Sequence, residues 1–371
     1  MAYKVLGLVD CFGNPEMGPL NRHRAIASTS LLGRYAFIDV QLSNFLHSGI
    51  SSMGVLCQNH IRSLSRHLGN GMSWISNTKL GDFTILYDEP NIQNSGYNTD
   101  VNDLIENDWY LKEINPDYVV ITNPYIVFSA DYGALLEDHI ASGAKITLLY
   151  AHKNDLSSSF MGQDKVYLTD RGKVTRIESN HGDIEEGDVS LGTMIMDIQT
   201  LYSLIDFAKD TSSFFGLWDV LRYISPSILV RCVKHEGYVR CFDSLSHYLE
   251  YSMELLDENV SNTFFNPERP IVTKSYDTPP TLLRKNSKVV NSSIANGSII
   301  EGEVYNSIIG RGVVIKEGCV IRNSVISSGS YIGPDTGIEF AVVDKEARVE
   351  HVSNIKGTLE DPLYIMRGDI V

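Results

Sequence analysis

Apolar positions in the first 256 residues follow two alternating patterns. Short runs of Val, Ile and Leu, each bounded by Gly, Asp, Asn or Pro, predict β-strands at residues 4–9, 53–57, 83–87, 118–122 and 145–150. Other apolar residues recur on one helical face, first Ile38, Leu42, Phe45 and Leu46, later Leu217, Val220, Leu221 and Ile224. Strands that alternate with amphipathic helices predict an α/β domain around a mostly parallel sheet. Such sheets bind ligands beyond the carboxyl ends of their strands, so we expect a site after Val9 and after Thr122.

The pattern changes after residue 256. Residues 257–281 contain four prolines and little periodicity, as expected of a linker. Beyond them, apolar residues recur at every sixth position, at Ile308, Val314, Val320, Ile326, Ile332 and Ile338. Small residues or Thr stand four places after the first five of these, at Gly312, Gly318, Ser324, Ser330 and Thr336. This period predicts a solenoid whose apolar residues point into a prism-shaped core, since a β-sandwich has a period of two.

Length, charge and cysteine content narrow the class of protein. A chain of 371 residues predicts two to three domains at roughly 150 residues each. The formal net charge of −15 makes nucleic acid and anionic membranes poor partners. No apolar run approaches the roughly 18 residues of a spanning helix, no signal peptide is evident, and the five cysteines form no C-x-x-C pair. We therefore expect a cytoplasmic protein whose cysteines are buried filler, although a reactive thiol stays open.

Three stretches resemble motifs of one family. Residues 33–50 are similar to G-K-Y-R-x-I-D-F-P-L-S-N-x-x-N-S-G-I, residues 55–58 and 63–68 to V-L-T-Q and S-L-x-x-H-L, and residues 242–256 to W-x-D-V-G-T-I-x-x-Y followed by M-D-L-L. Together they resemble the glucose-1-phosphate adenylyltransferase family of sugar nucleotidyltransferases. The resemblance implies a Rossmann-like nucleotidyltransferase domain at 1–256, a linker at 257–281 and a left-handed parallel β-helix of hexapeptide repeats at 282–371.

Adenylyl transfer requires a backbone cradle for the triphosphate, cations at the α-phosphorus and carboxylates for magnesium. The family carries G-G-G-x-G-T-R-L after its first strand, but residues 6–20 contain no glycine run and no Lys or Arg, and Asp10 and Glu16 have the wrong charge for phosphate. The motif P-L-T-x-x-R-A-K-P-A retains Arg24, while its Lys is replaced by Ile26. These replacements predict poor ATP binding.

The other catalytic motifs are also incomplete. The metal-binding G-D-H corresponds to 123–125, which contains no acid, and the E-K-P that binds sugar phosphate corresponds to 178–180, which contains no Lys. The G-T-A-D motif keeps only Asp100, and Asp243 alone remains as a metal carboxylate by position. The residual catalytic candidates are thus Arg24, Asp100 and Asp243, with Asp243 as the single metal candidate. Arg24 could instead be a surface cation, and Asp243 could cap the helix that follows it.

The pattern of loss resembles the GlgD-type subunit of bacterial glycogen synthesis. Membership implies a heterotetramer in which a catalytic homologue, with Mg²⁺, makes ADP-glucose, while this chain needs no cofactor alone and tunes activation by sugar phosphates. By position, Arg34, Gln58 and Arg66 are the regulatory or phosphate-binding candidates; a solvated charge and a polar loop are the alternatives. Two other functions stay open: an active adenylyltransferase with a divergent phosphate loop, and an acyltransferase with His351 as base.

Overall fold

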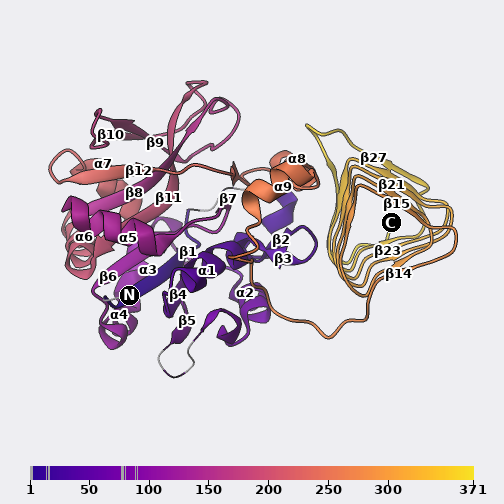
Figure 1. Cartoon of the computed structure of the whole chain (residues 1–371), viewed down its shortest axis with the longest axis horizontal. Helices are drawn as coiled ribbons and strands as arrows, with labels where there is room; N and C mark the ends of the chain where they lie inside the picture. Colours follow the sequence, from indigo (N-terminus) through magenta and orange to yellow (C-terminus); the bar gives the residue numbers. More distant parts are fainter. Residues whose placement is uncertain are drawn as a thin grey trace.

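The computed structural model describes residues 3–13, 15, 17–76, 79, 81–87, 89 and 91–371, so that Glu16 lies outside the described residues. Figure 1 shows two bodies, an α/β body formed by the first part of the chain and a triangular stack of coils formed by the last part. Both predicted architectures are therefore present.

The α/β body is built on a mixed sheet. Its strands are β1 (Val5–Asp10), β4 (Ser52–Leu56), β5 (Asp82–Leu86), β6 (Tyr118–Thr122), β8 (Ile146–Lys153), β9 (Asp164–Leu168), β10 (Val174–Ser179), β11 (Gly187–Asp197) and β12 (Val230–Lys234). Strands β5, β4, β1 and β6 are neighbours in that order and all parallel, as predicted. Strand β11 then pairs antiparallel with β6 and β8, and β8 pairs parallel with β12. The β9–β10 hairpin between β8 and β11 reverses the chain, and short connections of this kind produce antiparallel neighbours.

Helices cover both faces of this sheet (Figure 1). They are α1 (Phe37–His47), α2 (Ile61–Leu68), α3 (Asp100–Glu106), α4 (Asp108–Ile114), α5 (Tyr132–Ser142), α6 (Ile198–Thr211), α7 (Leu217–Ile224), α8 (Leu245–Glu254) and α9 (Glu258–Phe264). Side chains of β1 alternate between two cores, since Val5 and Val9 pack with α1 while Leu6 and Leu8 pack with α3, α6 and α7. None of the helices in the described ranges is long and apolar enough to cross a membrane.

Three flat parallel sheets form the C-terminal prism. Their strands are, in sheet order, β14 (Leu282–Leu283), β17 (Ile299–Ile300), β20 (Val314–Ile315), β23 (Tyr331–Ile332) and β26 (Arg348–Val349); β15 (Lys288–Val290), β18 (Glu303–Tyr305), β21 (Val320–Arg322), β24 (Gly337–Glu339) and β27 (Asn354–Lys356); β16 (Ser293–Ile294), β19 (Ile308–Ile309), β22 (Val325–Ile326), β25 (Ala341–Val343) and β28 (Leu363–Ile365). Each coil contributes one strand to each sheet, which is the architecture of a hexapeptide-repeat β-helix.

The inward positions differ in part from those predicted. Ile326, Ile332 and Ile338 are buried in the prism core, but in the preceding coil Ile309, Ile315 and Ile321 occupy it in place of the predicted Ile308, Val314 and Val320. The reason is that inward residues recur after six, six and then five positions, so that the register repeats every 17 residues, as from Ile321 to Ile338 to Ile355. A strict six-residue count drifts by one residue per coil, and one residue reverses the face of a strand.

The outward residues of one sheet join the two bodies. Ile308, Val325 and Val342 are stacked in register on β19, β22 and β25 and belong to the core of the α/β body. The hairpin of β2 (Ser30–Leu31) and β3 (Tyr35–Ala36) also approaches the prism, because a Cβ on Gly33 would lie 3.0 Å from the carbonyl oxygen of Ile309. A continuous apolar interface therefore holds the prism against the α/β body.

The segment between the bodies begins with helix α9, which the pattern did not predict, and continues as extended chain to β14. The extended chain is hydrogen-bonded to the α/β body: the Val272 amide donates to Ser43 Oγ over 2.9 Å, and Trp74 Nε1 donates to the Val272 carbonyl over 3.1 Å. The linker is therefore fixed to α1 and to the turn Met72–Trp74 that follows α2.

Candidate functional site

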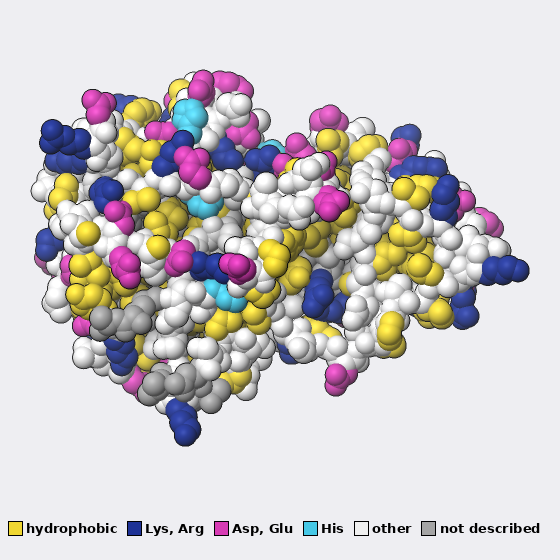
Figure 2. Space-filling model, viewed as in Figure 1, with side chains coloured by type: hydrophobic (Ala, Val, Ile, Leu, Met, Phe, Trp, Pro, Cys, Tyr) yellow, Lys and Arg dark blue, Asp and Glu magenta, His cyan; other side chains and the backbone are white. Residues whose placement is uncertain are grey.

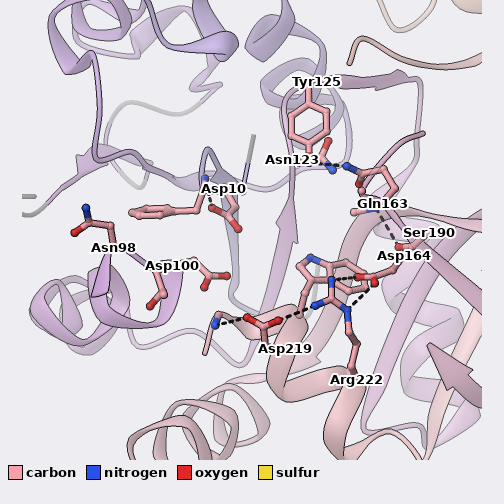
Figure 3. Close-up of a pocket in the computed structure, with 17 residues that line it drawn as sticks. Asp10, Asn98, Asp100, Asn123, Tyr125, Gln163, Asp164, Ser190, Asp219 and Arg222 are labelled. Atoms are coloured by element: carbon pink, nitrogen blue, oxygen red, sulfur yellow. Dashed lines mark hydrogen bonds and ion pairs between the residues drawn. The ribbon is translucent and has the colours of Figure 1, made fainter. Parts of the chain in front are cut away.

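The first cavity lies where the sheet topology predicts a site, beyond the carboxyl ends of β1 and β6. We call it the strand-end cleft; its volume is about 320 Å³. Figure 3 shows its polar side chains converging from several elements. It is lined by Asp10, Phe12, Gly13, Asn98, Thr99, Asp100, Asn123, Tyr125, Gly162, Gln163, Asp164, Ser190, Gly192, Gly216, Trp218, Asp219 and Arg222.

Two buried carboxyl groups face each other at the end of β1. Asp10 is buried and accepts a hydrogen bond from the Phe12 amide over 2.8 Å, while Asp100 accepts from the amides of Val101 and Leu217 over 2.8 and 3.0 Å. Burial, and then the nearby charge of Asp100, raise the pKa of Asp10 well above its usual range. Burial raises the pKa of Asp100 to about 6, against the opposing effect of its two amide donors. We infer that Asp10 holds a proton and donates it to the Asp100 carboxylate.

A second pair of carboxylates binds Arg222 in the cleft. Arg222 is the only Lys or Arg among the described residues that line it, and sequence reasoning missed this residue because no family motif marks it. Its guanidinium donates to Asp164 over 2.7 and 3.2 Å and to Asp219 over 2.7 Å (Figure 3). A phosphate group would therefore meet four carboxyl groups and no uncommitted cation in the described lining.

The magnesium ion implied by the family does not fit this lining. The metal carboxylate of the family is replaced by Pro124, and the neighbouring Asn123 uses its side-chain oxygen to accept from the Ile126 amide over 3.1 Å. In the described part of the chain, no group of three His, Cys, Asp or Glu residues is placed to hold a metal ion. The remaining candidate, Asp243, is not among the residues that line the cleft.

Of the three residual catalytic candidates, the structure places only Asp100 in the cleft. Asp243 binds His247 Nδ1 over 2.5 Å and the Met161 amide over 3.2 Å. It does not cap helix α8, because Ser244 Oγ accepts from the His247 amide at that terminus. Arg24 lies at the junction of the two bodies, where its guanidinium forms a buried ion pair with Asp344 of the prism.

The second cavity lies at this junction and differs in charge. We call it the junction cavity; its volume is about 650 Å³. Figure 2 shows acidic and basic side chains mixed over the visible face, so the charge of a cavity depends on its own lining and not on the net charge of the chain. The lining contains seven Arg and Lys residues and three His residues: Arg24, Arg34, Arg62, Arg66, Arg311, Lys345, Arg367, His23, His60 and His67.

The junction cavity combines distant segments. Arg34 and Arg66, two of the three predicted regulatory residues, both line it, whereas Gln58 does not. Arg311 and Lys345 come from the prism and were missed. They lie two coils apart, each three residues after an interface residue, so the 17-residue register stacks them on one corner. That register is the sequence signal that could have identified them.

Aromatic and acidic partners fix several of these cations. Arg311 lies over the ring of Tyr276 of the linker, 4.4 Å from its centroid. Asp39, at the N-terminus of α1, accepts from the Ala36 amide over 2.8 Å, as expected of a helix-stabilising acid, and its other oxygen binds His67 Nε2 over 2.5 Å.

Lys345 is largely enclosed, and burial followed by the nearby charge of Arg24 lowers its pKa to about 8. In the described lining Glu346 is the one acid, so this cavity suits an anion.

Comparison with known proteins agrees with this architecture. Residues 17–178 match the nucleotidyl transferase family, and residues 281–360 match the GlmU-like, C-terminal hexapeptide family. The chain is 32% identical to the glycogen biosynthesis protein GlgD of Geobacillus stearothermophilus, with 100% of this chain and 98% of that protein covered. It is 26% identical to the GlgD protein of Bacillus subtilis, with coverages of 98% and 96%.

A protein named as an enzyme is similarly related. The glucose-1-phosphate adenylyltransferase of Lachnospira eligens is 30% identical, with 81% of this chain and 71% of that protein covered. These relatives and the two matched domains support a role in glycogen and ADP-glucose synthesis. The chain belongs to the glucose-1-phosphate adenylyltransferase family, together with proteins named GlgD.

Proposed function

We propose that this chain is a non-catalytic, or nearly inactive, regulatory subunit of glucose-1-phosphate adenylyltransferase. It assembles with a catalytic homologue in the cytoplasm, as a heterotetramer, and tunes the response of that homologue to a sugar-phosphate effector. Magnesium then acts in the catalytic partner.

The position of positive charge supports this proposal. In the strand-end cleft the single described cation, Arg222, is bound by Asp164 and Asp219, so the α-phosphate of ATP would find no free partner there. At the junction, seven Arg and Lys residues line one cavity. Phosphate binding is thus favoured where the two bodies meet, and disfavoured where the family performs chemistry.

The junction cavity also has the construction of a regulatory site. Its lining combines helix α2, the β2–β3 hairpin, the linker and several successive coils of the prism, so a bound anion would contact elements from both bodies. An effector that binds one arrangement of these elements better than another shifts the population between them. Its phosphate would be held by Arg34 and Arg311, and Arg66 would add charge from α2.

The proposal is tested by measuring ADP-glucose formation by this chain alone, by the catalytic homologue alone and by both together, across a titration of a sugar-phosphate activator. We expect no turnover by this chain alone, and a raised rate or a shifted activator response in the mixture. Turnover by this chain alone that Asp243→Ala abolishes would instead support the active-enzyme alternative. A mixture that behaves like the homologue alone would contradict the regulatory role.

A further inference from the structure

The strand-end cleft retains a well-formed cavity although its phosphate-binding features are lost. Its lining combines carboxyl groups, the amides of Asn98, Asn123 and Gln163, and the rings of Trp218 and Tyr125. Arg222 is held by two carboxylates, and burial raises the pKa of Asp10 and Asp100, which lowers the charge that this pair carries. The cavity therefore offers many hydrogen-bonding groups, and its described lining contains no free Lys or Arg that would favour an anionic ligand.

Asn123 provides a second, independent observation. Only 7% of this residue is exposed, and its oxygen is used by the Ile126 amide. Among the described residues, no hydrogen bond engages its Nδ2 group, which lies against Gly192 at the cavity wall; a Cβ at position 192 would approach that nitrogen to 1.8 Å. This Nδ2 group, on a residue that lines the cavity, is therefore available to donate a hydrogen bond to a ligand or to water.

Two exposed aromatic rings lie on segments that also contribute to the cavity lining. Tyr97 and Phe214 are stacked with ring centroids 4.9 Å apart and are 40% and 50% exposed. Tyr97 immediately precedes the lining residue Asn98, and Phe214 lies two residues before the lining residue Gly216. An exposed ring beside a cavity rich in hydroxyl-binding groups offers an apolar face on which a second ring of a ligand can rest.

From these features we propose that the strand-end cleft binds a neutral, unphosphorylated sugar, with one hexose unit in the cavity and the next unit of an oligosaccharide on Tyr97. Hydroxyl groups would donate to the carboxylates and accept from Asn123 and from the second N–H of Gln163, whose Nε2 also donates to the Tyr125 hydroxyl over 2.9 Å. A sugar phosphate is disfavoured because its negative charge would meet Asp100, Asp164 and Asp219. This inference goes beyond the regulatory role and concerns a different cavity.

The test is calorimetric titration of the full chain with maltotriose, glucose and glucose 1-phosphate. Arg34→Ala combined with Arg311→Ala serves as background, so that phosphate binding at the junction does not interfere. We expect saturable binding of both neutral sugars and about tenfold weaker binding of glucose 1-phosphate. Absence of saturable sugar binding, or tighter binding of the phosphate, would overturn the proposal.

Variants locate the ligand. Gln163→Leu and Asn123→Leu should each weaken the binding of both sugars about fivefold, the effect of a lost hydrogen bond, while Gln199→Leu on the exposed side of α6 should change nothing. Tyr97→Ala should weaken maltotriose about threefold and leave glucose unchanged. If Asn123→Leu does not fold, Gln163→Leu alone decides. Equal affinities in Gln163→Leu and the unsubstituted background would show that the sugar binds elsewhere and would end the proposal.

Discussion

The two cavities of this protein differ in how their charges are used. In the strand-end cleft, Arg222 is bound by the carboxylates of Asp164 and Asp219, so no Lys or Arg in the described lining is left for a phosphate. In the junction cavity, Arg34 and Arg311 contact aromatic rings rather than carboxylates and keep their charge for a ligand. Within one fold, free positive charge can thus be absent from the cavity at the strand ends and gathered in a cavity between the two bodies.

The largest effect is expected at the ion pair between the two bodies. Arg24→Ala leaves Asp344 buried beside the hydroxyl of Tyr364 without its cation, and should lower the free energy of unfolding by about 3–5 kcal/mol. Chemical denaturation measures this loss. The matched control, Arg176→Ala, removes an exposed Arg that pairs with Glu178 and should change stability little. Equal effects of the two substitutions would show that Arg24 does not hold the junction.

A smaller effect is expected in the strand-end cleft, with a pH dependence of known sign. The raised pKa values of Asp10 and Asp100 mean that the native state binds more protons than the unfolded state above about pH 4, so stability falls as pH rises through the pKa of Asp100, about 6, and through the raised pKa of Asp10. Asp10→Asn keeps a donor toward Asp100 without a titrating proton. It should raise the free energy of unfolding at pH 8 by about 1–3 kcal/mol and flatten this pH dependence. A destabilised variant at pH 8 would refute the shared proton.

The next effect concerns phosphate binding in the junction cavity. Arg34→Ala combined with Arg311→Ala should weaken the binding of a sugar phosphate about tenfold, because the exposed Arg34 and the half-buried Arg311 are both removed from one cavity. Binding should also become less sensitive to salt. Calorimetry at two salt concentrations measures both changes. Arg171→Ala, at an exposed position between β9 and β10, is the control and should leave affinity unchanged.

The smallest effect concerns Lys345, whose pKa near 8 places its titration in an accessible range. A sugar phosphate is already a dianion above about pH 7, so its own charge stays constant there. As pH rises from 7 to 9, Lys345 loses its charge and affinity should fall about threefold. The substitution Lys345→Met should remove this dependence. A steeper loss that persists in Lys345→Met would assign the effect to another group.

The sequence pattern predicted those strands and helices whose formation depends on their own residues. The four parallel strands and helices α1 and α7 follow from apolar runs and helical faces that each element satisfies by itself. The direction of β11 did not follow, because it depends on the β9–β10 hairpin and on pairing across the sheet. The prism core was placed one residue off at Ile308, since the interface with the α/β body also selects apolar residues and the five-residue step is invisible to a six-residue count.

The candidate sites were less predictable than the fold. Arg34 and Arg66 were identified by resemblance and both line the junction cavity, but Arg311 and Lys345 become neighbours of Arg34 only when the coils stack against the α/β body. The motif around Arg24 suggested a place for this residue in the strand-end cleft. Arg24 is instead buried at the junction, because it pairs with Asp344, a residue 320 positions away in the sequence. Charge pairing of this kind depends on tertiary contacts that no local pattern records.

The most direct test of the account is where a sugar phosphate binds. Calorimetric titration should be carried out on the full chain, on the Arg34→Ala and Arg311→Ala double variant, and on Gln163→Leu as the cleft variant. We expect binding to weaken about tenfold in the junction variant and to be unchanged in the cleft variant. The reverse result, with affinity lost in Gln163→Leu and retained in the junction variant, would place phosphate in the strand-end cleft and contradict the division between the two cavities.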